Sequence, residues 1–178
     1  MTNVIMTAND IDRSLDRLSL EILERNHGLD RLAIIGIHTG GVYLAQRICS
    51  KIALHEGEAV QSGSLDITLY RDDWSLISQN PIVRKTDIGF SLEQQRVVLV
   101  DDVIFTGRTI RAAMDALMDY GRPDSIQLAV LVDRGGRELP IQPDYVGMIV
   151  KVGARQQVDV LLAENGGHDK VVVHEKKR

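Results

Sequence analysis

A short run near the middle of the chain, Arg96 to Thr109, reads R-V-V-L-V-D-D-V-I-F-T-G-R-T and constrains the fold more than any other stretch. Val97 to Val100 are four consecutive aliphatic residues without polar alternation, which is typical of a strand buried on both faces of a parallel sheet. Two carboxylates, Asp101 and Asp102, follow this predicted strand, and small or hydroxylated residues then lead into an amphipathic run. The pattern predicts a buried strand, a short polar loop and a helix N-terminus.

The junction of this loop with the helix suits a phosphate monoester. Unpaired backbone N–H groups and the positive end of the helix dipole converge there, and Gly107 permits close approach of an anion. Ionised carboxylates only accept hydrogen bonds, so the two aspartates suit sugar hydroxyls or a divalent cation. Aspartates at strand ends also occur as helix caps, but that role does not require T-G-R-T. The sequence therefore predicts a phosphorylated sugar with free hydroxyls as the ligand.

The run V-V-L-V-D-D-V-I-F-T-G-R-T resembles the phosphoribosyl pyrophosphate (PRPP) signature of type I phosphoribosyltransferases. The resemblance implies that Asp101 and Asp102 hold the ribose 2′- and 3′-hydroxyls and that Phe105 to Thr109 wrap the 5′-phosphate. Purine-salvage members carry an acid at the position of Phe105, so its absence argues against a purine substrate. The implied PRPP-binding residues are Val97, Val98, Leu99, Val100, Asp101, Asp102, Val103, Ile104, Phe105, Thr106, Gly107, Arg108 and Thr109.

A second strand, loop and helix precede this segment. Leu32 to Ile37 is a short apolar run, and the small-residue loop after it leads into a helix predicted from Val42 to about His55. On its own the loop is equally well interpreted as a simple glycine turn. The family places its pyrophosphate loop here, with backbone N–H groups as donors. Related regulators often carry Lys or Arg in this loop, which here consists of His38, Thr39, Gly40 and Gly41.

The stretch from Ser64 to Gln95 changes character along its length. Ser64 to Tyr70 alternates apolar and polar residues, which predicts a half-exposed strand, and the segment at about 71–95 is irregular, as in a lid or binding loop. Such a lid keeps water from an oxocarbenium-like centre. We expect Arg71 to neutralise the leaving pyrophosphate and Asp72 or Asp73 to help hold Mg²⁺, with solvated loop charges as the alternative.

A third predicted strand, Ser125 to Val132, leads into the loop D-R-G-G-R-E-L-P on the same rim of the sheet. We expect Val132, Asp133 and Arg134 to bind a nucleobase. Backbone groups of a glycine-rich loop match the two carbonyls and one N–H of uracil, and Arg134 can stack on or bond to the ring. A basic surface turn is the alternative interpretation of D-R-G-G-R alone.

Two longer runs, L-D-I-T-L-Y-R-D-D and V-D-R-G-G-R-E-L-P-I, resemble the PyrR family of bifunctional pyrimidine operon regulators and uracil phosphoribosyltransferases. PyrR proteins often carry His at the position of Gly136. The resemblance covers nearly the whole chain and implies an α/β fold of type I phosphoribosyltransferase type, with a mostly parallel sheet, flanking helices, a flexible lid and a small hood.

The rest of the sequence predicts the number of domains, the remaining helices and strands, and the cellular compartment. With 178 residues, of which 44% are hydrophobic, we expect a single domain over 1–178. Thr7 to His27 is a predicted helix capped by Thr7 or Asn9, and three late apolar runs finish the sheet or form the hood: Tyr145–Val150, Val158–Leu162 and Val171–Val173. Cys49 is predicted to be a buried structural thiol. Without a signal peptide or membrane-length apolar run, we expect a cytoplasmic protein without membrane partners.

The function implied by the resemblance is uracil phosphoribosyl transfer, in which uracil and PRPP give UMP and pyrophosphate. Mg²⁺ would be held mainly through PRPP, and the implied catalytic residues are Arg71, Asp72, Asp101 and Asp102. One alternative is a UMP-sensing regulator that binds the pyr mRNA leader, and another is a purine or orotate phosphoribosyltransferase. RNA binding needs clustered Lys and Arg. The first helix mixes acidic and basic residues and the later strands are poor in basic ones, so we expect RNA binding to be weak or lost. By analogy we expect a homo-oligomer, a dimer or larger.

Overall fold

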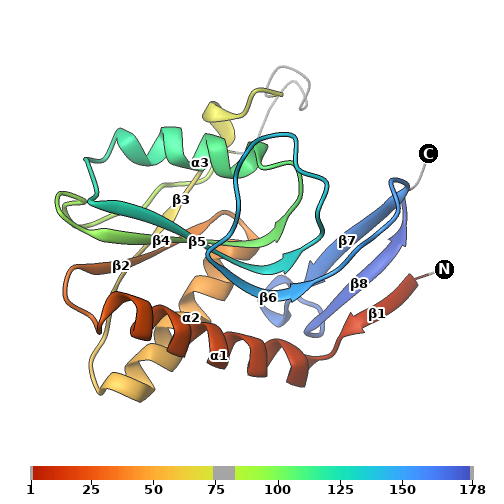
Figure 1. The fold of residues 1–178 in the computed structure, drawn as a ribbon, viewed down its shortest axis with the longest axis horizontal. Helices are drawn as coiled ribbons and strands as arrows, with labels where there is room; N and C mark the ends of the chain where they lie inside the picture. The colour runs from red at the N-terminus through yellow and green to blue at the C-terminus, as the bar shows by residue number, and fades with distance from the viewer. Residues whose placement is uncertain (1, 74–82, 177–178) are drawn as a thin grey trace.

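The computed structural model of the chain describes residues 2–73 and 83–176. Its main sheet has five parallel strands in the order β3-β2-β4-β5-β6 (Figure 1). Every residue of β2 and residues 97–101 of β4 are buried, which is why neither run shows polar alternation. The predicted α/β fold with a parallel sheet is confirmed. The strands are β2 (Leu32–Ile37), β3 (Gln61–Leu65), β4 (Arg96–Ile104), β5 (Ser125–Asp133) and β6 (Tyr145–Ile149).

Helices cover both faces of this sheet. α1 (Ala8–Asn26) and α2 (Gly40–Glu56) pack on one face, and α3 (Arg108–Met118) packs on the other (Figure 1). α2 begins two residues before the predicted Val42. Cys49 on α2 is half-buried against the core, and burial raises the pKa of its thiol to about 11.

The ends of α1 are set by local signals. The Thr7 hydroxyl accepts the N–H of Asp10, and the Asp10 carboxylate accepts the N–H of Thr7 at 2.8 Å, which makes a capping box. Of the two predicted caps, the structure therefore selects Thr7. The helix ends at His27, which is left-handed with φ 55°, and Gly28 follows with φ 96°. The predicted helix, Thr7 to His27, thus consists of α1 and its two cap residues, and Gly28 is the first residue after the C-terminal cap, as the sequence predicts.

A second, three-stranded antiparallel sheet lies beside the end of the main sheet, where both chain termini are drawn in Figure 1. This sheet, the hood, consists of β1 (Thr2–Met6), β8 (Lys170–Glu175) and β7 (Gln156–Leu161), in that order. The two alternatives left open for the late strands are both realised, because β6 completes the main sheet while β7 and β8 form the hood. β1 was not predicted.

The strand predicted at Ser64–Tyr70 is wrong over most of its length. β3 ends at Leu65, and Thr68–Tyr70 form a 3-10 turn. Asp66 ends the strand because its Oδ1 atom accepts the N–H of Thr68 at 2.7 Å and the Thr68 hydroxyl at 2.5 Å. A side chain that bonds the backbone two residues ahead favours a turn over a strand.

Part of the predicted lid at 71–95 is packed against the sheet. Asp87 forms an antiparallel bridge with Ser64, and Leu92 is completely buried. This later part, 83–95, is irregular as predicted, with no helix or strand beyond that bridge, but it is packed and does not stand free as a lid. Residues 74–82, which include Trp74 and Pro81, lie outside the described residues. Two further positions in this region, Arg71 and Asp72, belong to the site described below. Over residues 2–73 and 83–176, no helix is long and apolar enough to cross a membrane.

The strand order places two loops next to each other. β2 leads to β3 on one side, whereas β4 pairs with β2 on the other, with Gly36 opposite Val100. The loops that follow β2 and β4 therefore leave neighbouring strands at the carboxyl edge of the sheet, at the point where the strand order reverses. Ligands of parallel α/β sheets bind at such a point.

Candidate functional site

The acidic pair lies within β4, not after it as predicted. β5 continues alongside, pairing Asp101 with Val130 and Ile104 with Asp133, so the strand extends past both carboxylates. The two side chains differ in their exposure to solvent: Asp101 is only 7% exposed, whereas Asp102 is half-buried. The Asp101 carboxylate accepts the N–H of Asp102 at 3.0 Å, and the Asp102 carboxylate accepts the N–H of Val103 at 2.7 Å.

Charge on this pair is disfavoured by its surroundings. Burial, and next the neighbouring Asp102 carboxylate, raise the pKa of Asp101 well above its usual value. Burial is also the first cause of the raised pKa of Asp102. A ligand that brings hydroxyl donors or a cation to Asp102 would offset part of this cost.

The loop at residues 38–41 lies directly against the acidic pair. A β-carbon added to Gly40 would be 2.4 Å from Oδ2 of Asp102, and one added to Gly41 would be 2.2 Å from the carbonyl oxygen of Val100. Only glycine permits this approach. The His38–Thr39 peptide bond is cis, and Nε2 of His38 lies 3.3 Å from the carbonyl oxygen of Lys85.

Each of the two loops keeps some backbone donors unpaired. Within residues 2–73 and 83–176, the N–H groups of Gly40 and Gly41 have no protein acceptor, and the same holds for Gly107 and Thr109 after β4. Gly107 has φ 91° and directly precedes α3. Two sets of free donors, each at a helix N-terminus, therefore flank the acidic pair, and each set suits an anion.

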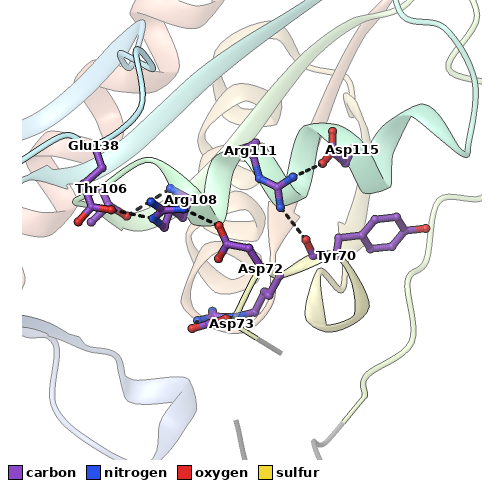
Figure 2. A network of polar contacts seen from close by, with 9 residues as sticks. Tyr70, Asp72, Asp73, Thr106, Arg108, Arg111, Asp115 and Glu138 are labelled. Atoms are coloured by element: carbon purple, nitrogen blue, oxygen red, sulfur yellow. Dashed lines mark hydrogen bonds and ion pairs between the residues drawn. The ribbon is translucent and has the colours of Figure 1, made fainter. Parts of the chain in front are cut away.

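Arg108, the first residue of α3, is held by two carboxylates from different segments. Its Nη1 atom donates to Oδ2 of Asp72 at 2.6 Å, and its Nε atom donates to Oε2 of Glu138 at 2.7 Å. Figure 2 shows Arg108 between these two side chains, beside Thr106. The partners of this arginine could not be predicted from the sequence, because they come from loops 36 residues before it and 30 residues after it.

Arg111 fixes the segment that carries Asp72. One helical turn after Arg108, its Nη2 atom donates to the carbonyl oxygen of Tyr70 at 2.9 Å, and its Nη1 atom pairs with Asp115 at 2.7 Å (Figure 2). Of the other predicted residues of this segment, Arg71 pairs with Asp73 at 2.8 Å. Both acids considered for Mg²⁺, Asp72 and Asp73, are thus paired with arginines.

The loop after β5 is bonded to residues 105–109, the predicted phosphate loop. The carbonyl oxygen of Thr106 accepts the N–H groups of Glu138 and Leu139, both at 3.0 Å. Arg137 pairs with Asp133 at 2.7 Å and donates to the carbonyl oxygen of Phe105 at 3.1 Å. Asp133, predicted to bind a base, is therefore engaged in holding its own loop, and the buried Val132 belongs to the core.

Arg134 lies between the main sheet and the hood. Its guanidinium carbon is 3.9 Å from the ring centre of Phe105, a cation–π contact, and its Nη2 atom donates to the carbonyl oxygen of Gln156 at 3.0 Å. Its Nε atom is buried without a partner among the described residues. Burial lowers the pKa of Arg134. A buried donor left unpaired in this way is a place for an acceptor on a ligand.

The described residues do not enclose a metal ion by themselves. Over residues 2–73 and 83–176, no group of three or more His, Cys, Asp or Glu side chains could hold one. The half-buried carboxylate of Asp102 can supply one oxygen ligand, and a bound substrate would have to supply most of the others.

Comparison with known proteins agrees with this geometry. The family model of the phosphoribosyl transferase domain matches residues 5–161. The "Bifunctional protein PyrR" of Desulfosudis oleivorans is 54% identical over 171 residues, covering 96% of this chain and 94% of that protein. The protein of the same name from Bacillus cereus strain AH820 is 50% identical over 175 residues, covering 97% of each.

Solved structures share the fold. The hypoxanthine phosphoribosyltransferase of Trypanosoma cruzi has a TM-score of 0.71 at 19% identity and covers 98% of this chain and 97% of its own. A hypoxanthine phosphoribosyltransferase from Staphylococcus aureus has a TM-score of 0.65 at 21% identity, with coverage of 85% and 79%. At such identities the likeness establishes the fold alone. From the domain match and the near-full-length relatives, we conclude that this chain belongs to the phosphoribosyl transferase domain family and, within it, to the PyrR proteins.

Proposed function

We propose that this phosphoribosyltransferase joins uracil to the ribose 5-phosphate of PRPP, giving UMP and pyrophosphate. One observation carries the proposal: the acidic pair on β4 lies between two loops, and the N–H groups of Gly40 and Gly41 in one and of Gly107 and Thr109 in the other are free. PRPP carries two phosphate groups of different kinds on either side of two ribose hydroxyls. The spacing of two anion sites around a hydroxyl-binding pair matches that ligand.

In this mechanism the bond from C1′ to the pyrophosphate oxygen breaks while a bond forms from C1′ to N1 of uracil, and the N1 proton passes to the departing pyrophosphate or to water. Residues 38–41 would bind the departing pyrophosphate through backbone N–H groups, and Asp102 would orient the ribose. The free N–H groups of Gly107 and Thr109 would hold the 5′-phosphate. Positioning and stabilisation of the leaving charge would supply most of the rate enhancement.

Mg²⁺ fits this site as a companion of PRPP. When bound, the ion would neutralise charge on the pyrophosphate, with Asp102 as the residue placed to contribute a ligand. The absence of a three-ligand protein cage among residues 2–73 and 83–176 is compatible with an ion held mainly by substrate oxygens.

Uracil is the proposed base because of Arg134 and Phe105. The unpaired Nε of Arg134 can donate to a pyrimidine carbonyl, and Phe105 adds an apolar ring, 44% exposed, in place of an acid. An uncharged aromatic residue offers no carboxylate to the N–H groups of a purine.

Radiolabelled uracil, orotate, hypoxanthine and guanine, each offered with PRPP and Mg²⁺, test the substrate. Only uracil should give a nucleotide product. Asp102→Asn should lower kcat/KM about 100-fold or more, whereas Asp12→Asn, on the outer face of α1, should leave it unchanged. Nucleotide formed from any base but uracil would overturn the assignment.

A second candidate function is UMP-responsive binding of the leader of a pyrimidine-operon mRNA. It is favoured by 50–54% identity over nearly the full chain to proteins named bifunctional. The first helix, with five acidic and three basic residues in α1, offers no basic cluster and still predicts weak binding or none. A filter-binding titration against such a leader, with and without UMP, decides this: submicromolar affinity enhanced by UMP would contradict the expectation of weak binding.

A further inference from the structure

Asp72 places a negative charge where the proposed function requires a phosphate. A cavity of about 270 Å³ lies over the start of α3, lined by Arg71, Asp72, Asp73, Thr106, Arg108 and Thr109. It contains the charged and hydroxylated groups of the phosphate loop. Within this cavity, the Asp72 carboxylate is bonded to the Arg108 guanidinium at 2.6 Å (Figure 2). The protein's own carboxylate therefore takes the place at Arg108 that a phosphate would need.

The position of Asp72 is set by the backbone before it. Arg111 holds the carbonyl oxygen of Tyr70 against the side of α3, two residues before Asp72. Arg108 and Arg111 lie on the same side of the helix because they are three residues apart. The carboxylate is therefore held within reach of Arg108 without any contribution from a ligand.

Glu138, the other partner of Arg108, has a different position. It bonds the Nε atom, and its own N–H donates to the carbonyl oxygen of Thr106 at 3.0 Å. Glu138 does not line the cavity. Its carboxylate thus orients the guanidinium from outside, whereas the Asp72 carboxylate engages the guanidinium from the cavity side.

We propose that Asp72 is an internal competitor for the 5′-phosphate, and that Glu138 is the positioning residue that keeps Arg108 at the phosphate loop. The inference rests on the proposed function, which places a phosphate monoester in this cavity. Glu138 already holds the Nε atom and Asp72 the Nη1 atom. A phosphate that bonds Nη1 from the cavity must therefore displace the Asp72 carboxylate, because the two anions would repel each other at that atom. The site therefore binds phosphate monoesters more weakly than the same site would bind them without the Asp72 carboxylate.

The effect is moderate because the pair is near the surface. The side chains of Arg108 and Asp72 are 49% and 39% exposed, and exposed ion pairs contribute little and are screened by salt. Removing the competitor should therefore tighten phosphate binding by about two- to five-fold at low ionic strength. The gain should shrink as salt is added.

The test is calorimetric titration of the full chain with ribose 5-phosphate, with inorganic phosphate as a second probe, at two salt concentrations. Asp72→Asn should bind ribose 5-phosphate about two- to five-fold more tightly than the unmodified chain. Asp73→Asn is the matched control, because it removes the same charge from the same cavity but pairs with Arg71 instead of Arg108. Glu138→Gln should weaken binding.

Equal affinities of Asp72→Asn and Asp73→Asn would overturn the inference, as would weaker binding by Asp72→Asn. A parallel assay of UMP formation separates this failure from failure of the proposed function. If the unmodified chain forms UMP but Asp72→Asn binds no more tightly, only the competitor is disproved. If no UMP forms yet Asp72→Asn binds ribose 5-phosphate more tightly than Asp73→Asn, the competitor stands and the uracil assignment fails.

Discussion

Asp101 has a carboxylate at a position where the protein interior disfavours charge. Its side chain is buried in the central strand of the sheet, next to the carboxylate of Asp102. A fold optimised only for stability would not keep an acid there, since an uncharged side chain of similar shape would cost less. The residue is better explained by binding than by stability.

Replacing Asp101 by Asn should stabilise the protein at neutral pH and reduce phosphoribosyl transfer. The folded-state pKa of Asp101 is raised, so its contribution is most favourable below the usual pKa near 3.8 and becomes less favourable as pH rises through the raised value. The variant should therefore melt a few degrees higher at pH 7, since about 1 kcal/mol corresponds to roughly 2–4 °C in a chain of this size. The difference should vanish towards pH 4. Thermal melts across this range check the sign, and a variant less stable at pH 7 would contradict it.

Gly41→Ala should damage both the fold and the site, because the added methyl group would meet the carbonyl oxygen of Val100 at 2.2 Å. Overpacking of this kind costs about 1–3 kcal/mol and would move the loop away from Asp102. Urea denaturation and UMP formation should both show the loss. Gly167→Ala, whose added carbon would meet only one atom, at 3.7 Å, is the control that should retain stability and activity.

At the scale of helices and strands, local signals predicted the elements well where they act over a few residues. Continuous apolar runs predicted β2, β4 and β5, because burial on both faces leaves no polar alternation. The alternation of apolar and polar residues at 64–70 predicted a strand wrongly, because Asp66 turns the chain there through its hydrogen bonds to Thr68. A single side chain that bonds the backbone nearby can favour a turn over a strand, and the periodicity of the sequence does not reveal this bond.

The cap of α1 provides a test at this scale. Thr7→Ala removes the hydroxyl that accepts the N–H of Asp10 and should lower the free energy of unfolding by about 1 kcal/mol. Asn9→Ala is the matched control, since Asn9 lies within the first turn and does not cap it. Denaturant titrations of both variants should separate them. If both variants lose the same free energy of unfolding, the hydroxyl of Thr7 does not stabilise the helix as a cap.

At the scale of the whole molecule, sequence predicted the loops of the site but not how they are joined. T-G-R-T indicated an anion site from its own residues, whereas I-H-T-G-G did so only together with the family resemblance. The pairing of Arg108 with Asp72 and Glu138, and the stacking of Arg134 on Phe105, depend on segments distant in sequence. Only the first strand of the predicted hood escaped prediction, and for the same reason, because β1 becomes a strand only by pairing with β8, with Val4 opposite Val172.

One arginine of α2 bonds the connection between β7 and β8 of the hood. Arg47 donates to both carboxylate oxygens of Glu164 and of Asp169, at 2.6–2.9 Å, and lowers the pKa of both acids. Arg47→Ala should therefore lower the free energy of unfolding by about 1–3 kcal/mol, and Arg47→Lys, which keeps the charge but not the paired geometry, by less.

Because both acids have lowered folded-state pKa values, this contribution is present above their usual pKa values near 4.5 and 3.8 and is lost as pH falls through the lowered ones. Urea denaturation at pH 7 and pH 3 should show a large difference between Arg47→Ala and the unmodified chain at the higher pH and a small one at the lower. The same difference at both pH values would show that Arg47 acts through packing instead of charge.

The hood joins the first strand of the chain to the last. During synthesis β1 leaves the ribosome early and must wait, its hydrogen-bonding edge open, until β8 has been made more than 160 residues later. The main sheet can assemble in the meantime from strands that are closer together along the chain. Formation of the hood should therefore be the last event of folding, and the wall beside Arg134 should be the last part of the binding pocket to appear.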